Sequence, residues 1–114
     1  MKTVYKIVAA ALWQAAEDSG VFAGAGIDLN DGFIHLSTGA QARRTAQLYF
    51  AGQGSLMLVA IDETSLGDAL KYEPSRDGDL FPHLYGSLPF TAVLSVRPLP
   101  LGADGRHIFP DDVD

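Results

Sequence analysis

The chain has 114 residues, of which 47% are hydrophobic, enough to bury one core but too few for two. Its formal net charge of −6 disfavours a broad contact with a nucleic-acid backbone or an anionic membrane, because both attract basic surfaces. The absence of cysteine excludes disulfides and thiolate-metal sites. We therefore expect a single domain over residues 1–114, with any binding of anions confined to a local group of cations.

The first segment predicts a strand followed by a helix. Thr3–Ile7 alternates between side chains of different polarity, and Ala9–Asp18 repeats apolar residues at helical spacing before Ser19 and Gly20. This start lacks the cations and the long apolar run of a signal peptide, so we expect a cytoplasmic protein without a membrane span. Lys6 interrupts the strand, and it either extends along a sheet edge or points into a site.

The next segment contains an unusual histidine. Val21–Asn30 has no sustained period, which predicts an ordered loop, and Gly32–Leu36 is a short apolar strand interrupted by His35. Ser37 is expected to cap a helix that ends near Gly52, with its hydroxyl accepting a first-turn amide. An imidazole beside free helix amides favours an anion. The alternative is a buried histidine satisfied by a backbone carbonyl.

Strands dominate the remaining prediction. Ser55–Ile61 is apolar at both parities, which is the pattern of a central strand covered on both faces. After a turn at Asp62–Asp68, Ala69–Pro74 alternates, so that its acidic end lies on the polar side of a strand. A charged loop at Ser75–Asp79 follows, and Thr91–Val96 predicts the last strand.

A second unusual histidine lies in Phe81–Gly86, which we interpret as a turn or short 3₁₀ segment. Its aromatic residues, proline and glycine would fix a loop around His83, and such loops often serve sites. Just upstream, Arg76 either pairs with Glu73 or is free to hold an anionic ligand. The alternative is that this segment only packs against the core and that Glu73 and Arg76 form a surface ion pair. We predict that these three side chains share one cleft with His35.

Other candidate residues are expected to be ordinary. His107 lies in a tail rich in proline, glycine and aspartate, where we expect a flexible, exposed imidazole. Arg43 and Arg44 are expected to be solvated on the polar face of their helix. The spacing of the histidines matches no metal motif, so no metal site is predicted.

Several segments closely resemble bacterial proteins that contain domain of unknown function 952. These segments span most of the chain and are Val4–Ile7, Asp28, Asp31–Ser37, Leu56–Asp62, Glu73–Arg76 and Leu80–Gly86. The two histidine motifs, Phe-Ile-His-Leu-Ser and Phe-Pro-His-Leu-Tyr-Gly, are the specific part of the resemblance.

The resemblance implies an α+β fold of the ADP-ribosylation type, similar to ADP-ribosyltransferases and RNA 2'-phosphotransferases. Such a fold has two small mixed or antiparallel sheets around a cleft, with two main helices. The segment His35–Ser37 matches a His-Leu-Ser of the phosphotransferases. Lys6 stands where those enzymes carry a catalytic histidine followed by Gly-Thr.

Two functions remain open at this point. The first is an enzyme, or a degenerate one, of the ADP-ribosyl or phosphotransferase class, acting on NAD or another phosphorylated nucleotide. Its catalytic residues would be His35, Glu73 and His83. Its ligand-binding residues would be Lys6, Ser37, Thr38, Arg76, Phe81 and Tyr85. The second is a non-catalytic module for a small anionic ligand or a protein partner; neither a certain cofactor nor an oligomeric state follows from the sequence.

Overall fold

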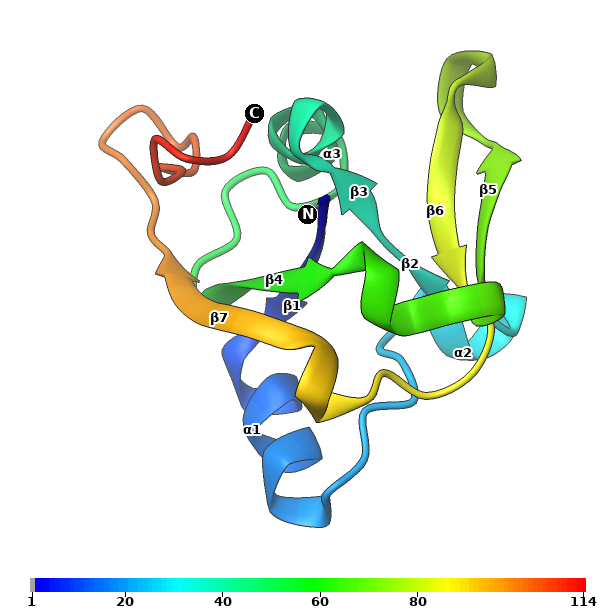
Figure 1. The fold of residues 1–114 in the computed structure, drawn as a ribbon. Coiled ribbons are helices and arrows are strands. Elements are labelled where there is room, and N and C mark those ends of the chain that lie inside the picture. Colours follow the sequence, from blue (N-terminus) through cyan, green and yellow to red (C-terminus); the bar gives the residue numbers. More distant parts are fainter. Residues whose placement is uncertain (1) are drawn as a thin grey trace.

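Two separate antiparallel sheets form the framework of the computed structural model, which describes residues 2–114 (Figure 1). The first sheet has the strand order β3 (Ser37–Thr38), β1 (Thr3–Ala9), β4 (Leu56–Asp62) and β7 (Val93–Leu99). The second sheet has the strand order β2 (Ile34–His35), β6 (Leu80–Leu84) and β5 (Leu70–Pro74). The predicted α+β class with two small sheets is therefore confirmed.

Short helices connect the strands. The α-helices are α1 (Ala10–Ser19), α2 (Ile27–Asp31) and α3 (Gly39–Tyr49). The 3₁₀ segments are η1 (Glu63–Ala69), η2 (Arg76–Gly78) and η3 (Phe90–Ala92). Within residues 2–114, no helix has the length and apolar character needed to cross a membrane.

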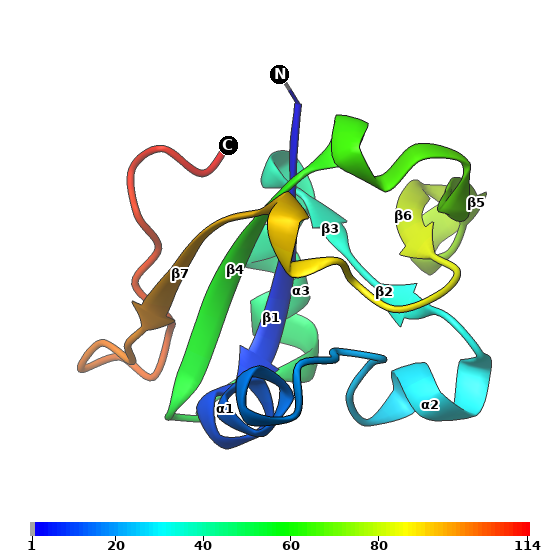
Figure 2. The same ribbon diagram turned by 60° about the horizontal axis from the view of Figure 1, so that its bottom comes forward.

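The first sheet is covered on both faces. One face packs against α3 and the C-terminal tail, and the other packs against α1 and the second sheet. Figure 2 shows α3 behind β1 and β4, and the second sheet to one side of them. Strand β4 alternates between the two cores, with Leu58 in one and Val59 in the other. The predicted central strand is confirmed, because both parities of its apolar pattern are buried.

The space between the two sheets is a packed apolar core. Val8 and Val59 of the first sheet belong to the same buried cluster as Ile34 and Leu84 of the second. Each such side chain gains about 1.5–3 kcal/mol from burial, which favours a filled interface over an open cleft. The cleft expected between the sheets is closed by this cluster, and the polar side chains of the second sheet lie mainly on its outer face.

Two predicted loops are regular elements. The end of the loop expected at Val21–Asn30 forms α2, and most of the turn expected at Phe81–Gly86 is strand β6. Strand β6 is the central strand of its sheet although it contains Pro82, a residue that usually indicates a strand edge. The Pro82 carbonyl still accepts a hydrogen bond from the Leu36 amide at 3.0 Å.

Candidate functional site

Two of the three histidines lie side by side on the outer face of the second sheet. His35 of β2 pairs with His83 of β6, and their ring centroids are 5.5 Å apart. Directly opposite residues of an antiparallel pair point to the same face of the sheet, and Lys71 of β5 lies opposite His83 on its other side. The two imidazoles therefore lie close together, as predicted, whereas Arg76, which was predicted to share their cleft, contacts Tyr49, Phe81 and Thr45.

His83 is a buried imidazole with one engaged nitrogen. Its Nδ1 lies 2.7 Å from Glu73 Oε1, and the Tyr85 hydroxyl donates to the same oxygen at 2.8 Å. The hydrogen bond from His83, and then that from Tyr85, lowers the pKa of Glu73. No residue of the described chain hydrogen-bonds His83 Nε2. A histidine that acts as a general acid or base is typically oriented by a carboxylate at one nitrogen and has its second nitrogen free.

His35 has both ring nitrogens engaged. Its Nδ1 lies 2.6 Å from Asp28 Oδ1, and its Nε2 lies 3.0 Å from Asp31 Oδ2. Its backbone amide also donates to Asp28 Oδ1, at 3.0 Å. A neutral imidazole has one N–H, whereas an imidazolium has two and can donate to both carboxylates at once. Donation to both carboxylates at once therefore requires the imidazolium form of His35.

Asp28 is the buried centre of this arrangement. Its Oδ2 lies 2.7 Å from Lys6 Nζ and accepts the Ala25 amide at 3.0 Å. Burial alone would raise the pKa of Asp28, but the Lys6 ammonium and the hydrogen bonds from Lys6, Ala25 and His35 hold it below its usual value. Burial lowers the pKa of Lys6, and the Asp28 carboxylate opposes that effect. An external anion would have to displace Asp28 to reach Lys6.

Glycines place Asp28 and Asp31. Gly24 has a φ of +121°, and a Cβ there would lie 2.8 Å from the Asp28 Cβ, so a side chain would push the buried carboxylate away. Gly32 follows α2 with a φ of +81° and leads the chain into β2. These two positions explain why a short helix can deliver both of its carboxylates to one imidazole.

Arg76 lies at the tip of the β5–β6 hairpin. Its guanidinium carbon is 4.7 Å from the Phe81 ring centroid and 5.7 Å from that of Tyr49, and Nη2 makes a long contact of 3.4 Å to Thr45 Oγ1. Within residues 2–114 it forms no ion pair with Glu73, so that predicted alternative is wrong. Stacking positions the cation, and most of its N–H donors have no protein acceptor in the described structure.

The two hydroxyl residues predicted to bind a ligand, Ser37 and Thr38, interact with other parts of the protein. Ser37 Oγ lies 3.1 Å from Thr45 Oγ1, which connects it to Arg76. Thr38, rather than Ser37, is the N-cap of α3, because it forms a capping box with Gln41. A side chain at Gly39 would clash with the backbone of the C-terminal residue. The first turn of α3 is thus capped and covered.

Phe33 belongs to the site, although it was not predicted as a site residue. Its ring centroid is 4.1 Å from that of His83, 4.5 Å from that of His35 and 5.2 Å from that of Tyr85. Its spacing of two residues from His35 on a strand was the available signal, since such residues share a face. Phe81, which was expected to stack on a ligand, is 6% exposed and lies under Arg76.

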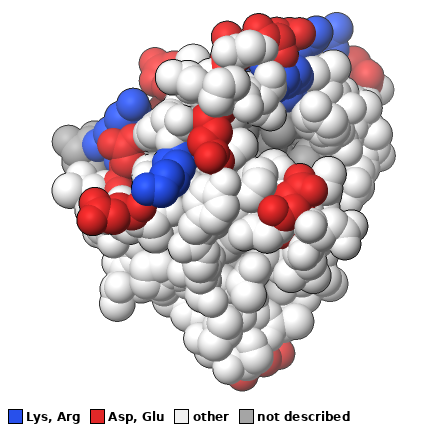
Figure 3. Space-filling view, turned by 90° about the vertical axis from the view of Figure 1, so that its right-hand side faces the viewer, with Lys and Arg blue, Asp and Glu red and all other residues white. Residues whose placement is uncertain are grey.

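Charges of both signs lie over one part of this face. In Figure 3, which views the side that carries β5, β6 and α2, acidic and basic side chains intermingle over the upper part, toward the hairpin tip. The lower part of this view is largely uncharged. Any attraction of an anion to this face therefore depends on individual cations rather than on a broad basic field.

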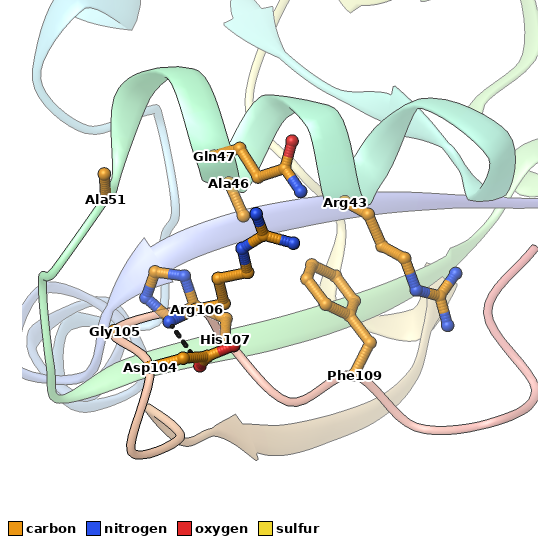
Figure 4. A pocket seen from close by; sticks show the side chains of 9 residues that line it. All are labelled: Arg43, Ala46, Gln47, Ala51, Asp104, Gly105, Arg106, His107 and Phe109. Carbon is orange, nitrogen blue, oxygen red and sulfur yellow. Dashed lines mark hydrogen bonds between the residues drawn. The ribbon is translucent and has the colours of Figure 1, made fainter.

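The third histidine lies elsewhere. His107 borders a hollow of about 510 Å³ between α3 and the tail, together with Arg43, Arg106 and Phe109 (Figure 4). His107 Nε2 is 2.7 Å from the Gln53 carbonyl, so it is not the free imidazole that was expected. Arg43 is not simply solvated either, because it donates to tail carbonyls, among them that of Pro110 at 3.4 Å.

Comparisons with known proteins give a consistent family assignment. The family model "Protein of unknown function (DUF952)" matches residues 7–96. The crystal structure of protein CC0527 from Caulobacter crescentus is 47% identical, with 93% of each chain covered and a TM-score of 0.89. The solution structure of CC0527 is 48% identical, with 93% of this chain and 91% of that chain covered and a TM-score of 0.83. No curated protein matched. The chain therefore belongs to the DUF952 family.

Proposed function

We propose that the outer face of the second sheet binds a phosphorylated nucleotide such as NAD, and that the Glu73–His83 pair performs acid–base chemistry on it. One observation carries the proposal. His83 is oriented by a carboxylate at Nδ1, while its Nε2 has no protein partner within the described residues. This nitrogen is not one of the described buried atoms that lack a partner, so it is open to a ligand or to water.

Neighbouring side chains supply the other requirements of such a ligand. Arg76 is held between two rings with unused donors, and Lys71 lies opposite His83, so both are placed to contact phosphate. The rings of Phe33 and Tyr85 offer apolar faces to a nucleoside ring. With NAD, His83 Nε2 would accept a proton from a water molecule whose oxygen bonds to the ribose carbon as the glycosidic bond breaks and nicotinamide leaves, and Glu73 would stabilise the imidazolium that forms.

The resemblance to the ADP-ribosylation type of fold supports the choice of ligand. The two antiparallel sheets are compatible with that fold, and His35–Ser37, the His-Leu-Ser segment, passes from the second sheet to the first. By this resemblance Lys6 stands where those enzymes carry a catalytic histidine, but Lys6 is paired with the buried Asp28. In this proposal the catalytic imidazole is His83.

Turnover of NAD tests the proposal. Purified protein is incubated with NAD, and released nicotinamide and ADP-ribose are separated by chromatography. His83→Ala should lower the rate roughly 100-fold or more, the usual contribution of a general acid or base. His107→Ala is the matched control and should retain the wild-type rate. Equal rates for the two variants would contradict the assignment of His83.

A non-catalytic binding module is the second candidate. It is favoured by the engagement of Lys6, Ser37 and the start of α3 with other parts of the protein, because these groups were predicted to bind the anion. Such a module would raise its melting temperature with ADP-ribose without consuming NAD. Thermal shift and turnover measured on one preparation distinguish the two candidates.

A further inference from the structure

The two carboxylates that contact His35 differ in how firmly they are held. The Asp28 side chain has no exposed surface and also contacts Lys6 and Ala25. The Asp31 side chain is 39% exposed, and within the described residues its one ion pair is with His35 Nε2, without any other side-chain hydrogen bond. Asp28 is thus a fixed part of the fold, whereas Asp31 can move into solvent at little cost.

We propose that Asp31 occupies the position of the ligand's acidic group, so that a phosphate or carboxylate binds His35 Nε2 by displacing Asp31. This inference rests on the proposed function. It adds that a second residue besides Arg76 recognises the acidic part of the ligand, and that Asp31 competes with the ligand for this residue.

The local charges favour such an exchange. His35 faces Asp28 and Asp31 from α2, His83 from β6, and the Lys6 ammonium, which donates to the His35 carbonyl at 3.1 Å. With Asp31 turned away, the charges of Lys6 and protonated His35 exceed that of Asp28 by one. An exposed ion pair is weak, whereas a phosphate brings more charge and several acceptor oxygens to the same N–H.

The surroundings of His35 select the kind of acidic ligand. The His35 imidazole is 30% exposed, and the Phe33 ring lies 4.5 Å from it, centroid to centroid. An acidic group bound at Nε2 is therefore close to an aromatic surface. Ligands that join a phosphate or carboxylate to a planar ring, as nucleotides do, fit this site better than an isolated inorganic anion.

Removal of Asp31 tests the competition. Calorimetric titration with ADP-ribose, and separately with inorganic phosphate, compares wild type with Asp31→Ala and Asp31→Asn. Loss of a weak competing ion pair should tighten ADP-ribose binding roughly two- to fivefold, with Asp31→Ala showing the full effect. Inorganic phosphate should bind more weakly than ADP-ribose in every case. Glu17→Ala removes one negative charge from the exposed face of α1 and should leave the affinity unchanged.

NMR of the His35 side chain tests the contact directly. Without ligand, the ¹⁵N resonance of His35 Nε2 should differ between Asp31→Ala and wild type. Addition of ADP-ribose should shift the same resonance in the wild-type protein. If wild type binds ADP-ribose but Asp31→Ala binds it equally or more weakly, the inference is wrong while the proposed function stands. An unchanged His35 resonance in Asp31→Ala also overturns the inference. If neither wild type nor any variant binds ADP-ribose, both the inference and the proposed function are wrong.

Discussion

His35 and His83 are neighbours in one sheet, yet their surroundings prepare them for different tasks. His35 is held by carboxylates at both nitrogens, whereas His83 is held at one and has no protein partner at the other in the described structure. Carboxylates at both nitrogens fix the position of an imidazole, while an imidazole with one unoccupied nitrogen can exchange a proton with a ligand. Their hydrogen-bond partners, rather than the residue type or the sheet, therefore distinguish the two histidines, and the proposed roles rest on this difference.

The carboxylates that bind the Nδ1 atoms of the two histidines also differ in burial. His35 depends on Asp28, whose charge is buried and balanced by Lys6. His83 depends on Glu73, which lies near the end of β5 and is partly exposed. Disturbing the first support should therefore damage the fold, while disturbing the second should alter chemistry and leave the fold largely intact.

The largest expected effect is that of Asp28→Asn on stability. The substitution leaves the Lys6 ammonium buried without a counter-charge, and breaking a buried ion pair on one side typically costs about 3–5 kcal/mol. Urea unfolding measures this change. Asp31→Asn is the matched control and should cost less than about 1 kcal/mol, because its ion pair is exposed. Similar losses in the two variants would contradict the distinction between fixed and exchangeable carboxylates.

The same residue predicts a pH dependence of stability. The pKa of Asp28 is lower in the folded protein than its ordinary value of 3.8. Its contribution is therefore fully present above that ordinary value and is lost as the pH falls through the folded-state value. Urea unfolding as a function of pH should show this acid-side loss in wild type and a smaller one in Asp28→Asn. Parallel curves for the two proteins would rule out this assignment.

Replacement of Arg76 is expected to have an intermediate effect on binding. Arg76→Ala should weaken ADP-ribose binding about tenfold, consistent with roughly 1.5–3 kcal/mol for a hydrogen bond to a charged group. Arg44→Ala should leave binding unchanged, because Arg44 is an exposed residue of α3 for which the described structure shows no hydrogen bond or ion pair. Calorimetric titration of the two variants makes the comparison. An effect of Arg44 without one of Arg76 would exclude the nucleotide contact at the hairpin tip.

Tyr85→Phe should have the smallest effect. It removes one of the two hydrogen bonds that lower the pKa of Glu73, so that pKa should rise toward its usual value of 4.5. The carboxyl ¹³C resonance of Glu73 followed through an acid titration reports the change. Tyr72→Phe is the control, because the Tyr72 hydroxyl donates to Glu63 instead. A rise in the control alone would show that the Tyr85 contact does not act on Glu73.

Short-range patterns in the sequence predicted a large part of this arrangement. The doubly apolar run of β4 indicated a strand covered on both faces, and the alternation of β5 placed Glu73 on a polar face. The two histidine motifs indicated one shared location, because each sets an imidazole among apolar residues that must be buried. These features depend on periods of two residues, which a sequence displays directly.

The remaining features depend on contacts between distant segments. Asp28 meets Lys6 across more than twenty positions, and neither residue type predicts that pairing. Strand β6 was predicted as a turn because it contains Pro82, and no local pattern shows that this strand lies between two others. The position of Arg76 against α3, away from Glu73, follows from stacking on Phe81 and Tyr49. Partners that come together only through the tertiary fold cannot be assigned from a single sequence.

An amide NMR titration of the wild-type protein with ADP-ribose tests the central claim most directly, because it locates the bound ligand without relying on any variant. The account predicts concentration-dependent shifts of the amide resonances of Phe33–His35, Phe81 and His83–Tyr85, in the second sheet and beside it. The amide resonances of residues 104–107, beside the hollow near the tail, should not shift. Shifts confined to that hollow, or no shifts at all, would contradict the proposed site.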